Sequence, residues 1–203
     1  MTARSDLVAD IVDLTGHNFS TTRINSIIRI AEANIARDLR IKSMYVVNDA
    51  FSISGATVAM PSGLLEVKRF RLNSNRNLLE YAAPNAFYDD PAYDQTGTPE
   101  LFTIEGDNFV FAPPPAATYT ALLGYLKRFD ALVADADTNS LLTNYYDVYL
   151  FSCLAVGFSF AQDDEQAQKY LALYQGIVDS LNIADQLTAR QSNSLRRRGM
   201  GSY

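Results

Sequence analysis

The sequence is poor in the residues on which most metal and catalytic chemistry depends. It has one cysteine, Cys153, one histidine, His17, and no tryptophan. One cysteine excludes an internal disulfide framework and a zinc site built from several cysteines of one chain. One histidine excludes a metal site with several histidine ligands. Cys153 lies in an apolar stretch and is interpreted as a small core residue, and His17, beside Gly16, as a loop or capping residue.

The motifs of common enzymes are also missing. There is no Gly-rich phosphate loop, no GxSxG elbow and no HExxH helix. The segment Asp135–Asn139 imitates the opening of a calcium loop, but Ser140 and Tyr146 stand where glycine and a bidentate glutamate are required. We interpret it as a turn and helix cap, and we interpret the acids 163–165 as a helix start. We therefore predict a protein that is not an enzyme and has no cofactor and no metal.

Long hydrophobic runs are absent as well. No apolar stretch approaches the roughly 18 residues that a membrane span requires. The first thirteen residues mix Arg4 and three aspartates with apolar residues, which is not the pattern of a signal peptide. We expect a protein without a membrane partner that is made in the cytoplasm, and that stays there or assembles there into something larger.

Acidic charge is present in excess but is unevenly distributed. The net charge is −6, yet residues 190–203 contain four arginines and no acid, which leaves −10 for residues 1–189. An acidic body is a poor binder of duplex DNA, because the phosphates repel it. A short basic end on such a body favours docking on an acidic partner surface.

Helical periodicity marks both ends of the chain. It predicts a helix that opens at Ser5 and stops at Gly16, and a longer one from Ser20 to about Arg40. Two consecutive helices, from about Asn144 to Ala161 and onward to about Arg190, meet at the acidic corner 163–165. The first of this pair is apolar almost all round, so we expect it to be buried on most sides.

Between these helices the period of the apolar residues changes from 3.6 to 2. Several short strands separated by turn residues are predicted there, together with one short helix near Pro84. The pattern predicts an α+β fold, in which a helical bundle of N- and C-terminal helices contains an inserted antiparallel β module. The predicted boundaries are 1–42 and 131–191 for the bundle, 43–130 for the β module and 192–203 for an extended C-terminal docking tail.

The predicted tail has no periodicity and three adjacent arginines, and we expect it to be disordered in an isolated chain. A solubilising tail is one interpretation. The interpretation we favour is a docking peptide whose arginines pair with carboxylates while three larger side chains occupy apolar pockets. The candidate site residues are Leu195, Arg196, Arg197, Arg198, Gly199, Met200 and Tyr203.

Several fragments, in this order and spacing, resemble the head-to-tail adaptor (connector) proteins of tailed bacteriophages and gene transfer agents. The resemblance covers about residues 20–182 and does not include the first helix or the arginine tail. The fragments are Met60–Asn73, Leu79–Tyr81 with Pro84 and Phe87, Gly97–Pro99, Phe102–Gly106, Pro113–Pro115, Thr138–Asp147, and Gln162–Glu165 with Tyr170 and Tyr174.

This resemblance implies a non-enzymatic protein of the virion, located at the head-tail interface and assembled in the host cytoplasm. Such adaptors form a ring of twelve neighbouring subunits beneath the portal protein, and the ring supports a downstream tail or nozzle protein. Genomic DNA passes through the central channel without sequence-specific binding. The resemblance also implies that the C-terminal segment reaches onto the portal.

Two other classes of function remain open from the residues. One is a soluble protein-binding module or tail-completion protein that forms no ring. The other is a hydrolase that uses a pair of carboxylates, since any two of the 23 acids could meet in the fold. The mass of the protein in solution, with and without portal, distinguishes an adaptor from a binding module.

Overall fold

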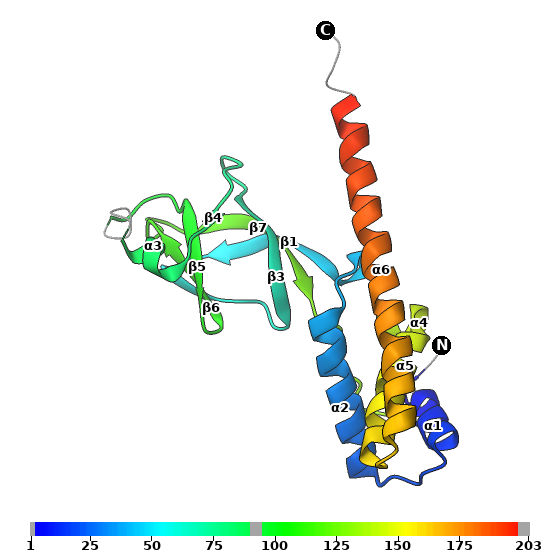
Figure 1. The fold of residues 1–203 in the computed structure, drawn as a ribbon. Coiled ribbons are helices and arrows are strands. Elements are labelled where there is room, and N and C mark those ends of the chain that lie inside the picture. Colours follow the sequence, from blue (N-terminus) through cyan, green and yellow to red (C-terminus); the bar gives the residue numbers. More distant parts are fainter. Residues whose placement is uncertain (1–2, 90–94, 199–203) are drawn as a thin grey trace. The chain divides into compact units, whose positions relative to one another are not determined.

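The chain divides into two compact units (Figure 1). A computed structural model describes residues 3–89 and 95–198, of which residues 188–198 are described by their backbone alone. We call residues 1–43 with 129–203 the helical unit and residues 44–128 the β unit. Helices and strands are thus segregated along the chain, and the predicted α+β fold is confirmed.

The helical unit is built from the two ends of the chain. Gly16, with φ of 66°, supplies the left-handed residue that ends the first helix. The Ser20 hydroxyl caps the second helix by accepting a hydrogen bond from the Arg23 amide. The helices are α1 (Arg4–Thr15), α2 (Thr21–Asp38), α4 (Ser140–Asn144), α5 (Tyr146–Phe160) and α6 (Asp164–Arg198), with a 3-10 turn, η1 (Lys42–Met44), at the boundary with the β unit.

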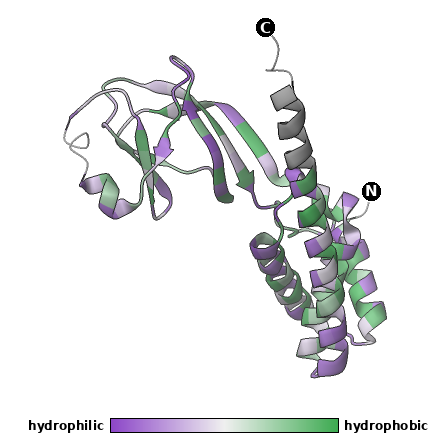
Figure 2. Ribbon diagram, turned by 45° about the horizontal axis from the view of Figure 1, so that its top comes forward, coloured by the Kyte–Doolittle hydropathy of each residue, from purple (hydrophilic) through white to green (hydrophobic). Residues whose placement is uncertain are grey.

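Helix α5 is the centre of the helical unit. It contacts α1, α2, α4 and α6, which together cover most of its surface. Val148, Tyr149, Cys153 and Leu154 on this helix are almost completely buried, as the apolar sequence predicts. The neighbouring helix α2 instead carries both hydrophobic and hydrophilic residues, and only its hydrophobic stripe is buried (Figure 2).

A tight turn joins α5 to α6. Gln162 adopts a positive φ of 61°, and Asp163 caps α6 by accepting a hydrogen bond of 3.1 Å from the Gln166 amide to its Oδ1. The sequence predicts that the bundle ends at residue 191 and that an extended segment begins at Ser192. This is wrong for residues 192–198, because α6 continues to Arg198. No glycine or proline occurs between Gly176 and Gly199, so propagating the helix through residues 192–198 costs little.

The β unit contains two sheets and one short helix. The three-stranded sheet has the order β1-β7-β3, and the four-stranded sheet has the order β2-β6-β5-β4. The elements are β1 (Tyr45–Ile53), β2 (Thr57–Ala59), β3 (Leu64–Leu72), β4 (Glu80–Tyr81), α3 (Pro84–Tyr88), β5 (Leu101–Glu105), β6 (Asn108–Ala112) and β7 (Tyr119–Lys127).

One strand pair departs from the predicted antiparallel module. Strands β4 and β5 pair in parallel, whereas the other pairs between these strands are antiparallel. Parallel neighbours need a crossover connection, and the segment between Tyr81 and Leu101, which contains α3, provides it.

An aromatic cluster joins the two sheets. It combines Phe51 of β1 and Phe70 of β3 with Phe102 of β5 and Phe109 and Phe111 of β6. Most of these rings meet edge to face, for example Phe70 and Phe102, whose centroids are 5.2 Å apart at an angle of 66°. Such pairs stabilise a core beyond the area that they bury.

Candidate interaction surfaces

The docking residues predicted from the sequence lie at and beyond the end of α6. Leu195 and the arginines 196–198 belong to its last turns, where the structure gives the backbone only. Gly199, Met200 and Tyr203 lie outside the described residues. The docking role of these seven residues therefore stays a prediction.

Before this end, α6 is fastened to the end of α2 by side-chain hydrogen bonds. Asn182 accepts a bond of 2.8 Å from the Arg40 amide and donates one of 2.9 Å to the Asp38 carbonyl. Asp185 accepts a bond of 3.0 Å from the Lys42 amide. The next apolar side chain, Leu187, is 51% exposed. Beyond Asp185 the helix runs past the other helices of its unit (Figure 1).

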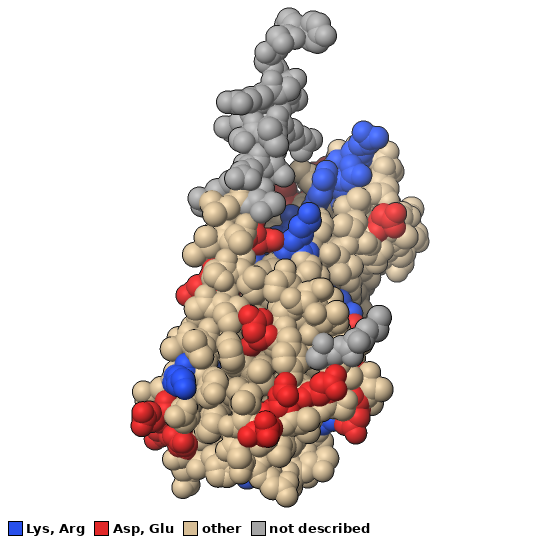
Figure 3. Space-filling view, turned by 90° about the vertical axis from the view of Figure 1, so that its right-hand side faces the viewer, with Lys and Arg blue, Asp and Glu red and all other residues tan. Residues whose placement is uncertain are grey.

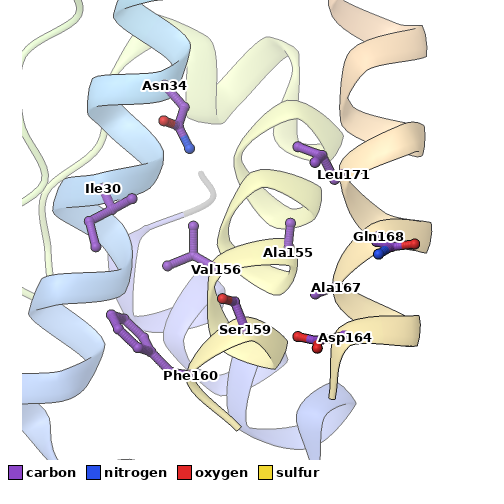
Figure 4. Close-up of a pocket in the computed structure, with 10 residues that line it drawn as sticks. All are labelled: Ile30, Asn34, Ala155, Val156, Ser159, Phe160, Asp164, Ala167, Gln168 and Leu171. Atoms are coloured by element: carbon purple, nitrogen blue, oxygen red, sulfur yellow. The ribbon is translucent and has the colours of Figure 1, made fainter. Parts of the chain in front are cut away.

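A groove of about 350 Å³ lies on the helical unit, over α5 and between α2 and α6. We call it the α5 groove. Its lining is mainly apolar, and Ile30, Phe160 and Leu171 are large apolar side chains that remain exposed there. Figure 4 shows the side chains of all three helices around it. The lining residues are Ile30, Asn34, Ala155, Val156, Ser159, Phe160, Asp164, Ala167, Gln168 and Leu171.

The rim of the α5 groove formed by α2 is basic. The Arg23 guanidinium lies over the Phe160 ring, 4.5 Å from its centroid, in a cation–π contact. Arg37 lies two turns of helix beyond Ile30 and donates a hydrogen bond to the Asn34 amide oxygen. The rim formed by α6 carries Asp164 instead. The groove therefore combines an apolar floor with one basic edge, which suits a protein partner better than a small polar substrate.

Three tyrosines of the helical unit, of which Tyr149 and Tyr174 are buried and Tyr146 is half-buried, form hydrogen bonds with polar groups of other segments. Tyr146 donates a hydrogen bond to Asp10, and Tyr174 donates one of 3.1 Å to Asp38. The Tyr149 hydroxyl accepts one of 2.9 Å from Asn139. Burial is the main cause that raises the pKa of each phenol well above its ordinary value. These groups stay protonated at neutral pH and connect helices.

The two segments that could imitate metal sites have structural roles. Asp137 accepts hydrogen bonds from the Ala134 and Val133 amides, which lower the pKa of its carboxyl group. Asn139 caps α4 through the Leu142 amide, so the predicted turn and cap are confirmed. Among the described residues no group of histidine, cysteine or acidic side chains could hold a metal ion. Cys153 is fully buried, and burial raises the pKa of its thiol.

A buried arginine is the main polar feature that the sequence did not reveal. Arg4 is 5% exposed, and its guanidinium donates hydrogen bonds to Asp135 and Asn25. It thereby connects α1 with α2 and with the segment before α4. Local periodicity carries no signal for a pair that is separated by 131 residues.

Without its basic segment 190–203, the helical unit is the more acidic part of the molecule. Residues 1–43 and 129–189 contain fourteen acids and seven bases, a net charge of −7, and residues 44–128 have a net charge of −3. Figure 3 shows the side of the helical unit on which α1 lies, and carboxylates predominate over its helices. Among the described residues, no helix is long and apolar enough to cross a membrane.

A sequence model of the SU10 adaptor protein family matches residues 1–198. The chain belongs to the SU10 adaptor protein family. This confirms the resemblance to phage head-to-tail adaptors that the fragments between residues 20 and 182 indicated. The match also includes α1 and α6, which lie partly or wholly outside those fragments. A comparison with curated proteins finds no match.

Membership in this family identifies the chain as a phage adaptor protein. Such a protein has a structural role in the virion, where it joins other components, and is not an enzyme. The surfaces that matter for this SU10-type adaptor are therefore those that it presents to other protein chains.

Proposed function

We propose that this adaptor forms a ring between the portal and the tail or nozzle of a bacteriophage virion. The ring contains twelve copies, its C-terminal segment docks on the portal, and the genome passes through its channel without sequence-specific binding. The observation that carries the proposal is the family match over residues 1–198. The number of copies rests on the resemblance to connector proteins.

The course of α6 supports docking by the C-terminal segment. This helix is fastened to the α2 end through Asn182 and Asp185, and it then continues to Arg198. A helix advances 1.5 Å per residue, so the thirteen residues after Asp185 carry the chain roughly 20 Å further. Such an arm carries the backbone of residues 196–198 well away from the acidic remainder of the helical unit.

The distribution of charge supports the same role. The segment 190–203 carries +4, and the rest of the chain carries −10. An arginine cluster pairs well with carboxylates of a partner, and guanidinium–carboxylate bonds can be bidentate. An acidic wall also repels DNA phosphates weakly, which favours free passage of the genome.

The proposal is tested by measuring mass in solution with and without purified portal. A ring adaptor gives a complex with a fixed multiple of its own mass when portal is added. A soluble binding module or tail-completion protein that forms no ring gives no such complex. This second outcome would overturn the proposed function.

The docking segment is tested with three variants in the same assay. Deletion of residues 192–203 should leave the helical content of residues 3–187 intact but weaken attachment to portal. Replacing Arg196, Arg197 and Arg198 by glutamate should weaken it further, because like charges then face each other. Undiminished attachment of the deletion variant would refute docking by the tail.

A charge-matched control distinguishes the effect of the tail arginines on portal attachment from the effect of the net charge of the chain. Lys68, Arg69 and Arg76 are three exposed bases of the β unit. Their replacement by glutamate changes the net charge by the same amount as the tail substitution, and it should leave portal attachment largely unchanged. If both triple variants lose attachment equally, the electrostatic part of the docking proposal is wrong.

A further inference from the structure

The α5 groove and helix α1 lie on different sides of α2. Asn25 of α2 accepts a hydrogen bond from Arg4 of α1, so this side of α2 faces α1. Asn34 lines the groove. Residues that are nine positions apart on a helix point in opposite directions, because successive residues are rotated by about 100°. Helix α1 therefore cannot cover the groove of its own chain.

Helix α1 exposes acids on its outward face and one leucine at its C-terminal end. Leu7 and Ile11 of this helix are buried against the helical unit. Asp6 and Asp13 are both exposed, and their spacing of seven residues puts them on one face. Leu14 follows Leu7 by seven residues and so lies on the side of the buried stripe, but at the end of the helix it remains 48% exposed.

The face of α2 beside the groove has the opposite charge. Arg23, Ile30 and Arg37 follow one another at intervals of seven residues, so they form one line along the helix. Both arginines are exposed, and Ile30 between them opens into the apolar groove. One chain thus presents an acidic helix with an exposed leucine at its end, and a basic face with an apolar groove.

We propose that α1 of one copy docks on the α5 groove of a second copy. Leu14 enters the groove, and the carboxylates of α1 lie toward Arg23 and Arg37 of α2, away from Asp164 on the opposite rim. We call the exposed surface of α1 the donor surface and the α5 groove with its basic rim the acceptor surface. Because the two surfaces differ, the contact is heterologous. Repeated contacts of this kind close into a ring when the rotation between copies permits it.

This inference deepens the proposed function, because it assigns the contact between neighbouring subunits of the ring. It involves neither the arginine tail nor the portal. Self-association can therefore be measured on the full chain alone, and portal attachment can be measured separately. If the proposed contact between copies is wrong, the proposed attachment to portal is unaffected, and the reverse also holds.

Disulfide cross-linking gives the most direct test. The variant Leu14→Cys/Ile30→Cys places one cysteine on each proposed surface, while the native Cys153 is buried and remains as it is. Under oxidation at high protein concentration, we expect a ladder of dimers and larger multimers on a non-reducing gel. The matched control is Leu14→Cys/Leu173→Cys, since Leu173 is exposed but does not line the groove. Equal ladders from the two variants would overturn the proposal.

Charge reversal tests the direction of the contact. Asp6→Lys/Asp13→Lys removes the donor surface, and Arg23→Glu/Arg37→Glu removes the acceptor surface. Neither variant should self-associate alone, but a mixture should form one-to-one dimers that grow no further, because each variant keeps one intact surface. Absence of these mixed dimers, or unchanged self-association of either variant, would overturn the proposal.

Two further variants test the same contact between copies. The chain with all four charges exchanged should recover self-association, since opposite charges again face each other. Asp6 also accepts a hydrogen bond from the Ala3 amide at the start of α1. Asp13→Lys alone therefore repeats the donor test without disturbing that cap. Sedimentation velocity at low and high salt measures all these variants, and self-association of the native chain should weaken with salt.

Discussion

The two units of this adaptor are held together by different kinds of core. In the helical unit, one apolar helix, α5, lies among four others, and two tyrosines at its N-terminal end form hydrogen bonds with polar groups of other segments. In the β unit, phenylalanines from four strands meet in one aromatic cluster. The helical core thus depends on apolar packing together with buried polar pairs, whereas the β core depends mainly on aromatic packing.

This difference has a chemical consequence. Buried polar pairs respond to pH and to the loss of one partner, because an unsatisfied buried group is costly. Aromatic packing responds to changes of volume and is almost indifferent to pH. The helical unit should therefore lose stability when the pH changes or a polar partner is removed, and the β unit mainly when a core side chain changes in volume.

The largest effect is expected from a charge placed in α5. Leu154 is completely buried at the centre of the helical unit. Leu154→Asp puts an unpaired carboxylate there, and we expect a loss of more than about 4 kcal/mol, enough to prevent folding of the unit. Circular dichroism at 222 nm measures the loss of helix. Leu173→Asp, at an exposed position of α6, is the control and should fold normally; a cooperative Leu154→Asp variant would show that α5 is less buried than described.

The next effect tests the aromatic cluster. Phe109 is fully buried and its ring contacts those of Phe51, Phe70 and Phe102. Phe109→Ala leaves a cavity, and we expect the free energy of unfolding to fall by about 3–5 kcal/mol. Urea unfolding measures this change. Leu78→Ala, at an exposed position of the β unit, should change it by less than about 0.5 kcal/mol; equal effects would argue against a core at Phe109.

A smaller effect follows from the three hydrogen-bonded tyrosines of the helical unit. Burial raises the pKa of Tyr146, Tyr149 and Tyr174 above the value of about 10 for an exposed tyrosine. Above that pH the unfolded chain loses protons that the folded helical unit retains. The stability they contribute is therefore complete below pH of about 10 and decreases as the pH rises further. Urea unfolding followed at 222 nm from neutral to alkaline pH measures this dependence.

Tyr149→Phe tests the contribution of one phenol to the loss of stability at alkaline pH. It removes the hydroxyl that accepts a hydrogen bond from Asn139, and should cost about 1 kcal/mol at neutral pH. The variant should also lose stability less steeply at alkaline pH, because one fewer group titrates. An unchanged dependence on pH would mean that this phenol does not contribute to alkaline unfolding.

The smallest effect concerns the turn between α5 and α6. The sequence allows either Asp163 or Asp164 to cap α6, and the structure assigns the hydrogen bond to Asp163. Asp163→Ala should lower the free energy of unfolding by about 1 kcal/mol. Asp164→Ala removes only a favourable charge from the first turn of α6 and should lower the free energy of unfolding by roughly 0.3 kcal/mol. Thermal unfolding of both variants compares them, and the reverse order would reassign the cap.

Much of the secondary structure follows from short stretches of sequence. The stop of α1 at Gly16, the start of α2 after Ser20 and the burial of α5 were all predicted, because caps and periodicity are encoded by residues a few positions apart. The end of α6 was not predicted correctly, since a stretch of polar residues without glycine or proline is compatible with both helix and extended chain.

The candidate surfaces were predicted only in part. The sequence identified the arginine tail by its composition. It gave no indication of the α5 groove, whose lining residues come from three helices and appear in the sequence as ordinary members of apolar stripes. The gap between two helix stripes depends on how the helices pack, which periodicity does not specify.

By itself the sequence determined which stretches are helices or strands, which helix is central, and the family to which the chain belongs. Only the tertiary structure decided that Arg4 is buried against Asp135 and Asn25, that β4 pairs in parallel with β5, and that α1 and the α5 groove lie on different sides of α2. The reason is physical: local order follows from neighbouring residues, whereas pairing between segments that are twenty to more than a hundred residues apart exists only once the chain has folded.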